Sequence, residues 1–430
     1  MGRVASEVQT QLRAGFSFPN LAGQKEVLSR FLLLGMVALF CLNIYPCLLP
    51  RFDYPALEQR YKNWMAGLGN TEWFIGDNDL YAYAGWRYVK GASPDEINFE
   101  HPPLAKYLIG LSCLVFSNSN VISAVLGVCS LLILYELCKK LLGDSLFALV
   151  PVYMLSLDRL FVGFSSTSML DIYLVFFLLL SVLLFGCVDS DVKMFGGAVA
   201  LGLASACKLT APFAIPSLMI PVIARRKKTA WKFLLQGLLV AAFVYCLSYA
   251  WFFMLGHGLS DFLKLQWEMF MYQYGRRYGA LTPGLFLLTL LTGVAGPETR
   301  NIIYVDEISR TFTVVTKHGL AMVREFNILT WPLCFSAAIL SFSQAVRTRN
   351  TGLFQSCVYF FSFLVPFIVA QSFVWYLLPA LPIGLLLLTN TLKKIVEESN
   401  WKLSSLIFLI YLAALFLWSR LVNIPSFIEL

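Results

Sequence analysis

Apolar runs separated by short polar segments make up most of this 430-residue chain. A helix needs about 20 apolar residues to cross roughly 30 Å of hydrocarbon, and these runs approach or reach that length. The pattern predicts an all-α polytopic membrane protein with about eleven transmembrane helices. They are expected at residues 31–49, 119–137, 145–164, 170–188, 195–214, 213–224, 230–255, 330–346, 354–372, 375–392 and 403–421.

The apolar stretch at residues 195–224 leaves two interpretations open. Ala211-Pro212 and Ile215-Pro216 interrupt it, and a proline kinks or ends a helix because it lacks the backbone N–H. The stretch is therefore either a bent pair of helices or one long helix. The count of eleven takes it as a pair, since the distribution of basic residues then agrees with the rest of the chain.

Lysine and arginine in short loops favour the cytoplasmic side of a membrane. With the N-terminus cytoplasmic and the C-terminus outside, the short outer connections and the outer tail receive only Arg159 and Arg420. The inner segments receive Arg3, Arg13, Lys25, Arg30, Lys139, Lys140, Lys193, the basic run 225–228, Lys232, Arg347, Arg349, Lys393, Lys394 and Lys402. This asymmetry supports the predicted orientation.

Two long loops, at residues 50–118 and 257–328, then lie on the outer face. The second contains an apolar segment, 281–296, which we interpret as interfacial or re-entrant. As a full span it would move Arg347 and Arg349 to the outside. The whole chain, 1–430, is expected to form a single membrane-embedded domain.

Composition agrees with this class and excludes others. Hydrophobic residues make up 58% and charged residues 13% of the chain, whereas soluble domains carry about 25% charged residues. The net charge of +8 is spread over the loop clusters, which argues against nucleic-acid binding. None of the ten cysteines forms a CxxC pair, so neither a disulfide framework nor a zinc site is expected. No cleavable signal peptide is evident before the first span.

Two carboxylates, Asp77 and Asp79, lie in the first outer loop. Asp77, Tyr81 and Ala84 share one face at helical spacing, so a short interfacial helix could present Asp77 to a ligand. The alternative is that Gly76-Asp77 only caps this helix, because aspartate is a favoured N-cap residue. The residues alone do not separate these two interpretations.

Glu100 and His101 follow in the same loop, before Pro102-Pro103 and an amphipathic segment at residues 104–116. The prolines hold the preceding backbone extended, either to position two functional side chains or as an ordinary loop-to-helix transition. Asp171 opens the fourth span. A helix N-terminus stabilises a carboxylate there, so capping is again the alternative to a functional role.

Together these motifs resemble the protein O-mannosyltransferases, a group of GT-C membrane glycosyltransferases. The lipid A aminoarabinose transferases are more distant relatives. The similarity runs in order from about residue 75 to 392. It rests on Asp-x-x-x-Tyr-Ala at Asp77, His-Pro-Pro-Leu-Ala-Lys at His101–Lys106, Met-Leu-Asp at Asp171, Cys-Lys-Leu-Thr at Lys208, Thr-Trp-Pro-Leu at Trp331, and Tyr-Leu-Leu-Pro-Ala-Leu-Pro at Tyr376.

The resemblance implies a short prokaryotic-type form without a MIR domain. Such an enzyme takes a sugar, mannose by analogy, from a polyprenyl or dolichyl phosphate. It transfers the sugar with inversion to a hydroxyl acceptor, such as a protein Ser or Thr, on the outer or luminal face. The membrane would be the cell membrane, or the endoplasmic reticulum of a eukaryote. The lipid-linked donor, the acceptor and membrane lipids are the expected partners, and a divalent metal requirement stays open.

By the same resemblance, Asp77 is the base and the first outer loop is the catalytic loop. Asp79 and Asp171 complete the expected catalytic set. Tyr81, Glu100, His101, Lys106 and Lys208 are expected to contact substrate. An aromatic segment, 262–278, could cover the prenyl chain or form an interfacial belt.

The chain departs from the family pattern at two positions. Asn78 stands where the family has Glu, so Asn78, Asp79 or neither fills the second acidic role. Ser166 stands where eukaryotic members have an Arg. The phosphate-binding cation is then sought at Lys208, Arg159 or Arg276-Arg277.

Two other functions are weighed against this one. An enzyme of the same fold could glycosylate a lipid or a polysaccharide, and the sequence does not separate these acceptors. A transporter or flippase is disfavoured, because the spans contain few ionisable residues beyond Lys208 and show no repeat relating two halves.

Overall fold

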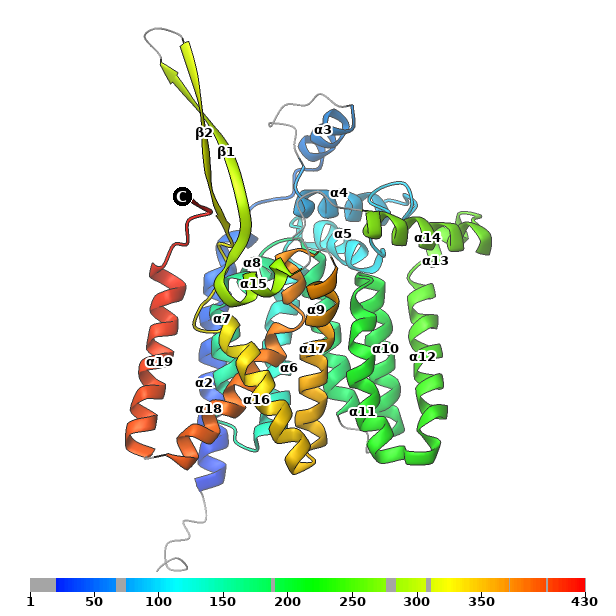
Figure 1. The fold of residues 1–430 in the computed structure, drawn as a ribbon. Helices are drawn as coiled ribbons and strands as arrows, with labels where there is room; N and C mark the ends of the chain where they lie inside the picture. Colours follow the sequence, from blue (N-terminus) through cyan, green and yellow to red (C-terminus); the bar gives the residue numbers. More distant parts are fainter. Residues whose placement is uncertain are drawn as a thin grey trace, which may run out of the picture.

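The computed structural model describes residues 21–66, 75–186, 190–275, 284–306, 311–370, 372–399 and 401–429. A bundle of roughly aligned helices forms its main body (Figure 1). The bundle comprises α2 (Leu21–Ile44), α6 (Val121–Leu142), α7 (Leu149–Leu157), α8 (Arg159–Ser165), α9 (Leu170–Phe185), α10 (Asp191–Cys207), α11 (Ile215–Arg226), α12 (Ala230–Leu247), α13 (Ala250–Met254), α16 (Trp331–Thr348), α17 (Thr351–Val369), α18 (Leu381–Glu398) and α19 (Trp401–Leu421).

Each predicted span overlaps one of these helices or a consecutive pair of them, which confirms the helical, multi-pass architecture. By length and hydropathy, five helical stretches in the described part of the chain are suited to cross a membrane. The number is six if α8 and α9, which meet at 105°, count as one broken span. The figure of eleven crossings and the orientation therefore stay predictions.

The stretch at 195–224 is a broken pair rather than one long helix. α10 ends at Cys207, and a short 3₁₀ helix, η3 (Ala211–Ala214), leads into α11. Pro212 and Pro216 each lie in the first turn of their own helix, where the missing N–H has no intrahelical acceptor to lose. The prolines thus mark helix starts, and Lys208 falls in the break between α10 and η3.

Both long loops gather at one end of the bundle (Figure 1). The first loop forms α3 (Tyr54–Met65), α4 (Asp77–Val89) and α5 (Leu104–Phe116), and the second begins with α14 (Leu259–Gly275). α4, α5 and α14 lie across the ends of the bundle helices. The turns between α11 and α12, α16 and α17, and α18 and α19 lie at the opposite end. The remaining short 3₁₀ helices are η1 (Tyr45–Leu48), η4 (Lys227–Thr229) and η5 (Val374–Leu377).

A β-hairpin in the second loop was not predicted. After the eight-residue helix α15 (Leu285–Thr292), strands β1 (Val294–Asp306) and β2 (Thr311–Met322) pair antiparallel, and β3 (Phe427–Glu429) adds to β2. Eight residues rise only about 12 Å in a helix, which is too short to cross the bilayer. The described part of 281–296 therefore agrees with an interfacial or re-entrant piece.

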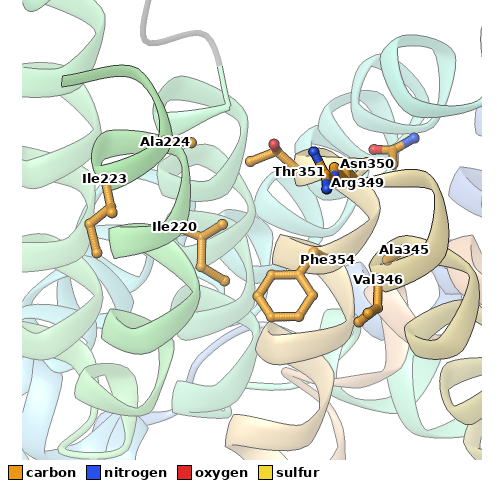
Figure 2. Close-up of a pocket in the computed structure, with 9 residues that line it drawn as sticks. All are labelled: Ile220, Ile223, Ala224, Ala345, Val346, Arg349, Asn350, Thr351 and Phe354. Carbon is orange, nitrogen blue, oxygen red and sulfur yellow. The ribbon is translucent and has the colours of Figure 1, made fainter. Parts of the chain in front are cut away.

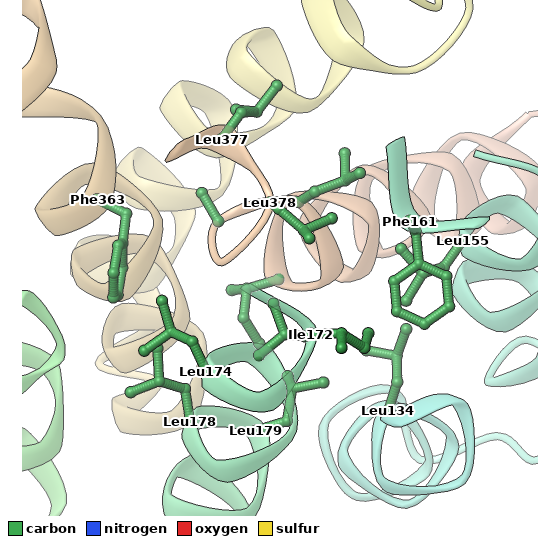
Figure 3. Close-up of a cluster of buried hydrophobic side chains, with 14 of the residues drawn as sticks. Leu134, Leu155, Phe161, Ile172, Leu174, Leu178, Leu179, Phe363, Leu377 and Leu378 are labelled. Atoms are coloured by element: carbon green, nitrogen blue, oxygen red, sulfur yellow. The ribbon is translucent and has the colours of Figure 1, made fainter. Parts of the chain in front are cut away.

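Helix α9 forms the centre of the packed core. Leu174 and Leu178 lie on one side of it and Ile172 and Leu179 on another, and all four are fully buried (Figure 3). Helices α6, α17 and η5 supply facing side chains (Figure 3). A helix that is apolar all round must be surrounded by other helices or by lipid. This burial fixes the start of α9, and with it the position of Asp171.

Helices α4 and α5 cross at two glycines. A Cβ added at Gly85 would lie 2.3 Å from the Lys106 carbonyl oxygen, and one at Gly110 would lie 2.0 Å from the Gly85 carbonyl oxygen. Both obstacles are backbone atoms, so side-chain repacking cannot relieve them. The two helices therefore depend on this close approach.

Gly85→Ala should lower the free energy of unfolding, because overpacking of a tight contact typically costs about 1–3 kcal/mol. Thermal unfolding of the purified protein in detergent measures the effect. Gly35→Ala in α2 is the matched control, since nothing lies within 4 Å of its added Cβ. Equal unfolding temperatures for the two variants would show that the α4–α5 crossing tolerates a wider spacing.

Candidate active site

Asp77 is the first residue of α4. The N-cap is Gly76, so Asp77 is not the N-cap residue of this helix. The Asp77 side chain is partly exposed, whereas Asn78 is exposed. An accessible carboxylate at the loop-bearing end of the bundle suits a base.

Asp171 and Lys208 form a buried ion pair. The Lys208 Nζ lies 2.6 Å from Asp171 Oδ1, and the side chains are 5% and 2% exposed. Asp171 lies in the first turn of α9 and Lys208 directly follows α10. Breaking such a pair leaves an uncompensated buried charge. The pair therefore ties the two helix ends together.

Three further motif segments meet at this pair. The Tyr376 ring lies 4.8 Å from Lys208 Nζ, close enough for a cation–π contact. Helix α5 packs against α9 and α10, the helices that carry the two members of the pair. Asp77 acts electrostatically on Asp171. Residues from α4, α5, α9, α10 and η5 thus converge on one place.

Lys106 has protein partners, and its expected contact with substrate stays a prediction. It is completely buried, and its ammonium donates to the Asn98 carbonyl, to Asn98 Oδ1 at 3.2 Å and to the His101 carbonyl at 2.8 Å. Burial lowers the pKa of Lys106 to about 7, and the charge of Glu100 acts in the opposite direction. Lys106 therefore holds the loop at residues 98–101 against α5.

Lys106→Met should loosen this loop and lower activity by at least about tenfold, because three oxygens, one buried and two partly buried, lose their donor. Amide hydrogen exchange of residues 98–101 should accelerate in the variant. Lys90→Met is the control, since Lys90 lies over the Trp86 ring in the same loop and is exposed. Unchanged exchange in Lys106→Met would contradict the positioning role.

The loop that Lys106 holds contains Glu100 and His101, and Tyr81 of α4 packs against it. The Tyr81 ring packs edge-on against His101 with centroids 5.9 Å apart, and both are buried. The Asn98 amide donates to Glu100 Oε1 at 2.7 Å. Glu100 and His101 therefore lie just before α5 with defined partners, and their substrate contacts stay a proposal.

Helix α14 is anchored to the first loop. Gln273 donates to the Glu100 carbonyl at 2.9 Å, and the Phe99 and Tyr272 rings meet edge-on at 5.7 Å. Phe262 and Met269 are buried on one face of α14, whereas Trp267 and Phe270 are exposed. The two outer loops thus form one assembly, with an apolar face of α14 left open.

Asp79 faces a different environment from Asp77. Its carboxylate forms an ion pair with Arg60 of α3 at 2.8 Å. Both residues line a cavity of about 280 Å³ between α3, α4 and the α5–α6 connection. The pair is partly exposed. The structure therefore gives Asp79 a contact between α3 and α4, and sequence reasoning missed its partner because nothing links Arg60 to it along the chain.

Arg159, another predicted phosphate-binding cation, has partners at the end of α19. The Arg159 guanidinium donates to the carbonyls of Trp418, Ser419 and Val422 at the end of α19, where a cation complements the helix C-terminus. Arg276-Arg277 lies outside the described residues. Ser166 donates to the Gly163 carbonyl at 2.9 Å.

Trp331, from the Thr-Trp-Pro-Leu motif, has a structural contact. Its indole Nε1 donates to Asp158 Oδ2 at 3.0 Å, while Asp158 Oδ1 accepts from two backbone N–H groups at the start of α8. Both Trp331 and Asp158 are buried. This contact locks α16 to the α7–α8 break, a role that the motif alone did not reveal.

Among the described residues, no three His, Cys, Asp or Glu side chains gather as metal ligands. The Asp171 carboxylate is already paired with Lys208. The candidate site thus consists of one accessible carboxylate, one buried ion pair and a braced loop.

Residues 100–251 match the family model of dolichyl-phosphate-mannose-protein mannosyltransferases. No curated protein sequence matches the chain significantly. Among solved structures, ArnT from Cupriavidus metallidurans bound to undecaprenyl phosphate is 15% identical with a TM-score of 0.59, covering 89% of this chain and 63% of its own.

Two further solved structures are similar. The Saccharomyces cerevisiae Pmt1–Pmt2 complex bound to the sugar donor is 11% identical with a TM-score of 0.55, covering 91% of this chain and 89% of its own. The oligosaccharyltransferase AglB from Archaeoglobus fulgidus, in complex with an inhibitory peptide and a dolichol-phosphate, is 12% identical with a TM-score of 0.52. The match covers 91% of this chain and 55% of the AglB chain. The chain spans less than two thirds of the length of the ArnT structure.

The fold is that of the GT-C membrane glycosyltransferases, which confirms the predicted fold class. Within that class, the match to the family model indicates a multi-pass membrane protein similar to the protein O-mannosyltransferases.

Proposed function

We propose that this protein transfers a sugar from a polyprenyl or dolichyl phosphate to a hydroxyl acceptor. The family match over residues 100–251 and the lipid-phosphate ligands named for ArnT and AglB support a lipid-linked donor. The observation that carries the proposal is the Asp171–Lys208 pair together with the packing of α5 against α4, which carries Asp77, and against α9 and α10. Mannose and a protein Ser or Thr are the proposed sugar and acceptor.

Asp77 is the proposed general base. It would accept the proton of the acceptor hydroxyl while the oxygen attacks the anomeric carbon, and the bond between that carbon and the phosphate oxygen would break. Such proton transfer contributes typically 10²–10⁴ in rate. Attack from the face opposite the phosphate inverts the configuration of the sugar.

The leaving phosphate needs a cation rather than a proton, and Lys208 is the proposed contact. Its ammonium has three N–H donors, one of which points to Asp171. Asp171 would hold this cation in place, and Lys106 would position Glu100 and His101 through the braced loop. Lys106 would thus act on the substrate only through Glu100 and His101.

A transfer assay with the purified full-length protein tests the proposal. The donor is a dolichyl phosphate bearing radiolabelled mannose, and the acceptors are a Ser/Thr-containing peptide and, separately, a glycolipid. We expect label on the peptide and one free dolichyl phosphate released for each sugar transferred. Label on the glycolipid alone would select the lipid-acceptor alternative, and donor movement across vesicles without release would identify a transporter.

A further inference from the structure

An apolar groove lies at the end of the bundle opposite α4 and α5. It has a volume of about 390 Å³ and separates α11 from the corner between α16 and α17. Ile220 of α11 and Phe354 of α17 face each other across it (Figure 2). Ile223 is 49% exposed and Val346 56% exposed. The walls are thus hydrocarbon that the protein itself leaves uncovered.

One end of the groove is basic. Arg349, in the turn between α16 and α17, lines it and is exposed. In the described part of the chain, no carboxylate pairs with Arg349. Across the groove, α11 runs into the basic residues 225–228. Of these, Arg226 is paired with Asp191, so the mouth of the groove carries a net positive charge.

We propose that this groove binds an anionic phospholipid, with acyl chain against the α11 and α17 walls and the phosphate at Arg349. A basic pocket between membrane helices matches an anionic headgroup. Free phosphate would leave the apolar walls uncovered, whereas a lipid satisfies both the walls and the charge. The site lies away from the proposed sugar-transfer site and does not depend on it.

Native mass spectrometry of the full-length protein in detergent tests the site. Phosphatidylglycerol and phosphatidylcholine with the same acyl chains are the two probes. We expect phosphatidylglycerol to bind more tightly, and Arg349→Gln to weaken its binding by about fivefold, the effect of one basic residue near an anionic lipid. Phosphatidylcholine binding should change little. Val346→Trp, at an exposed wall position, should weaken both lipids.

Arg347→Gln is the matched control. Arg347 lies two residues before Arg349 and carries the same charge, but its side chain does not line the groove. If Arg347→Gln and Arg349→Gln weakened phosphatidylglycerol binding equally, the surface charge as a whole would explain the preference, and the proposal would be overturned. Equal binding of the two lipids to the wild type would also overturn it. Stronger binding of a polyprenyl phosphate than of phosphatidylglycerol would assign the groove to the carrier lipid instead.

Discussion

Asp77→Asn should lower turnover by at least about a hundredfold while donor binding changes little. The amide keeps the size of the side chain but cannot accept the proton of the acceptor hydroxyl. Gly76, not Asp77, occupies the N-cap of α4, so the helix should survive the substitution. Steady-state transfer rates and donor affinity, measured on the same preparation, separate the loss of chemistry from the loss of binding.

Asp79→Asn is the matched control. Asp79 lies two residues away on the same helix and pairs with Arg60 in a partly exposed contact, which is worth about 0–1 kcal/mol. We expect a small loss of stability and a milder loss of activity. Full activity in Asp77→Asn together with an inactive Asp79→Asn would mean that the base is Asp79. Full activity in both variants would remove this part of α4 from the mechanism.

The sequence predicted the bundle well, because apolar runs and helical periodicity are local properties. The residues of α5 were expected to form a helix and do so over Leu104–Phe116. The break at Lys208 was left open and needed the structure, since proline both starts and interrupts helices. The hairpin of β1 and β2 was not predicted, because β1 begins at Val294, inside the apolar segment 281–296 that was interpreted as one interfacial or re-entrant piece.

At the candidate site, the sequence named residues but could not predict their partners. Asp171 and Lys208 were both named, but their direct pairing joins α9 to α10 and cannot be seen from spacing. Lys106 was assigned to substrate because it ends the His-Pro-Pro-Leu-Ala-Lys motif of the family that the chain resembles. The fold surrounds it with three oxygen acceptors. Such contacts depend on how the loop returns over α5.

Removing one member of the Asp171–Lys208 pair should destabilise the protein strongly. Asp171→Asn leaves the Lys208 ammonium buried without a counter-charge, and Lys208→Met leaves the carboxylate in the same state. A broken buried pair typically costs about 3–5 kcal/mol. Asp191→Asn is the control, because the Arg226–Asp191 pair is more exposed and should cost only about 0–1 kcal/mol. Unfolding in detergent measures all three variants.

The double variant Asp171→Asn with Lys208→Met distinguishes a structural pair from a chemical one. With neither charge present, nothing is left uncompensated, so most of the lost stability should return. Transfer activity should remain low, because no cation then faces the leaving phosphate. If activity recovered along with stability, the pair would serve only to join α9 and α10, and the phosphate contact would have to be sought among other basic residues of the outer loops.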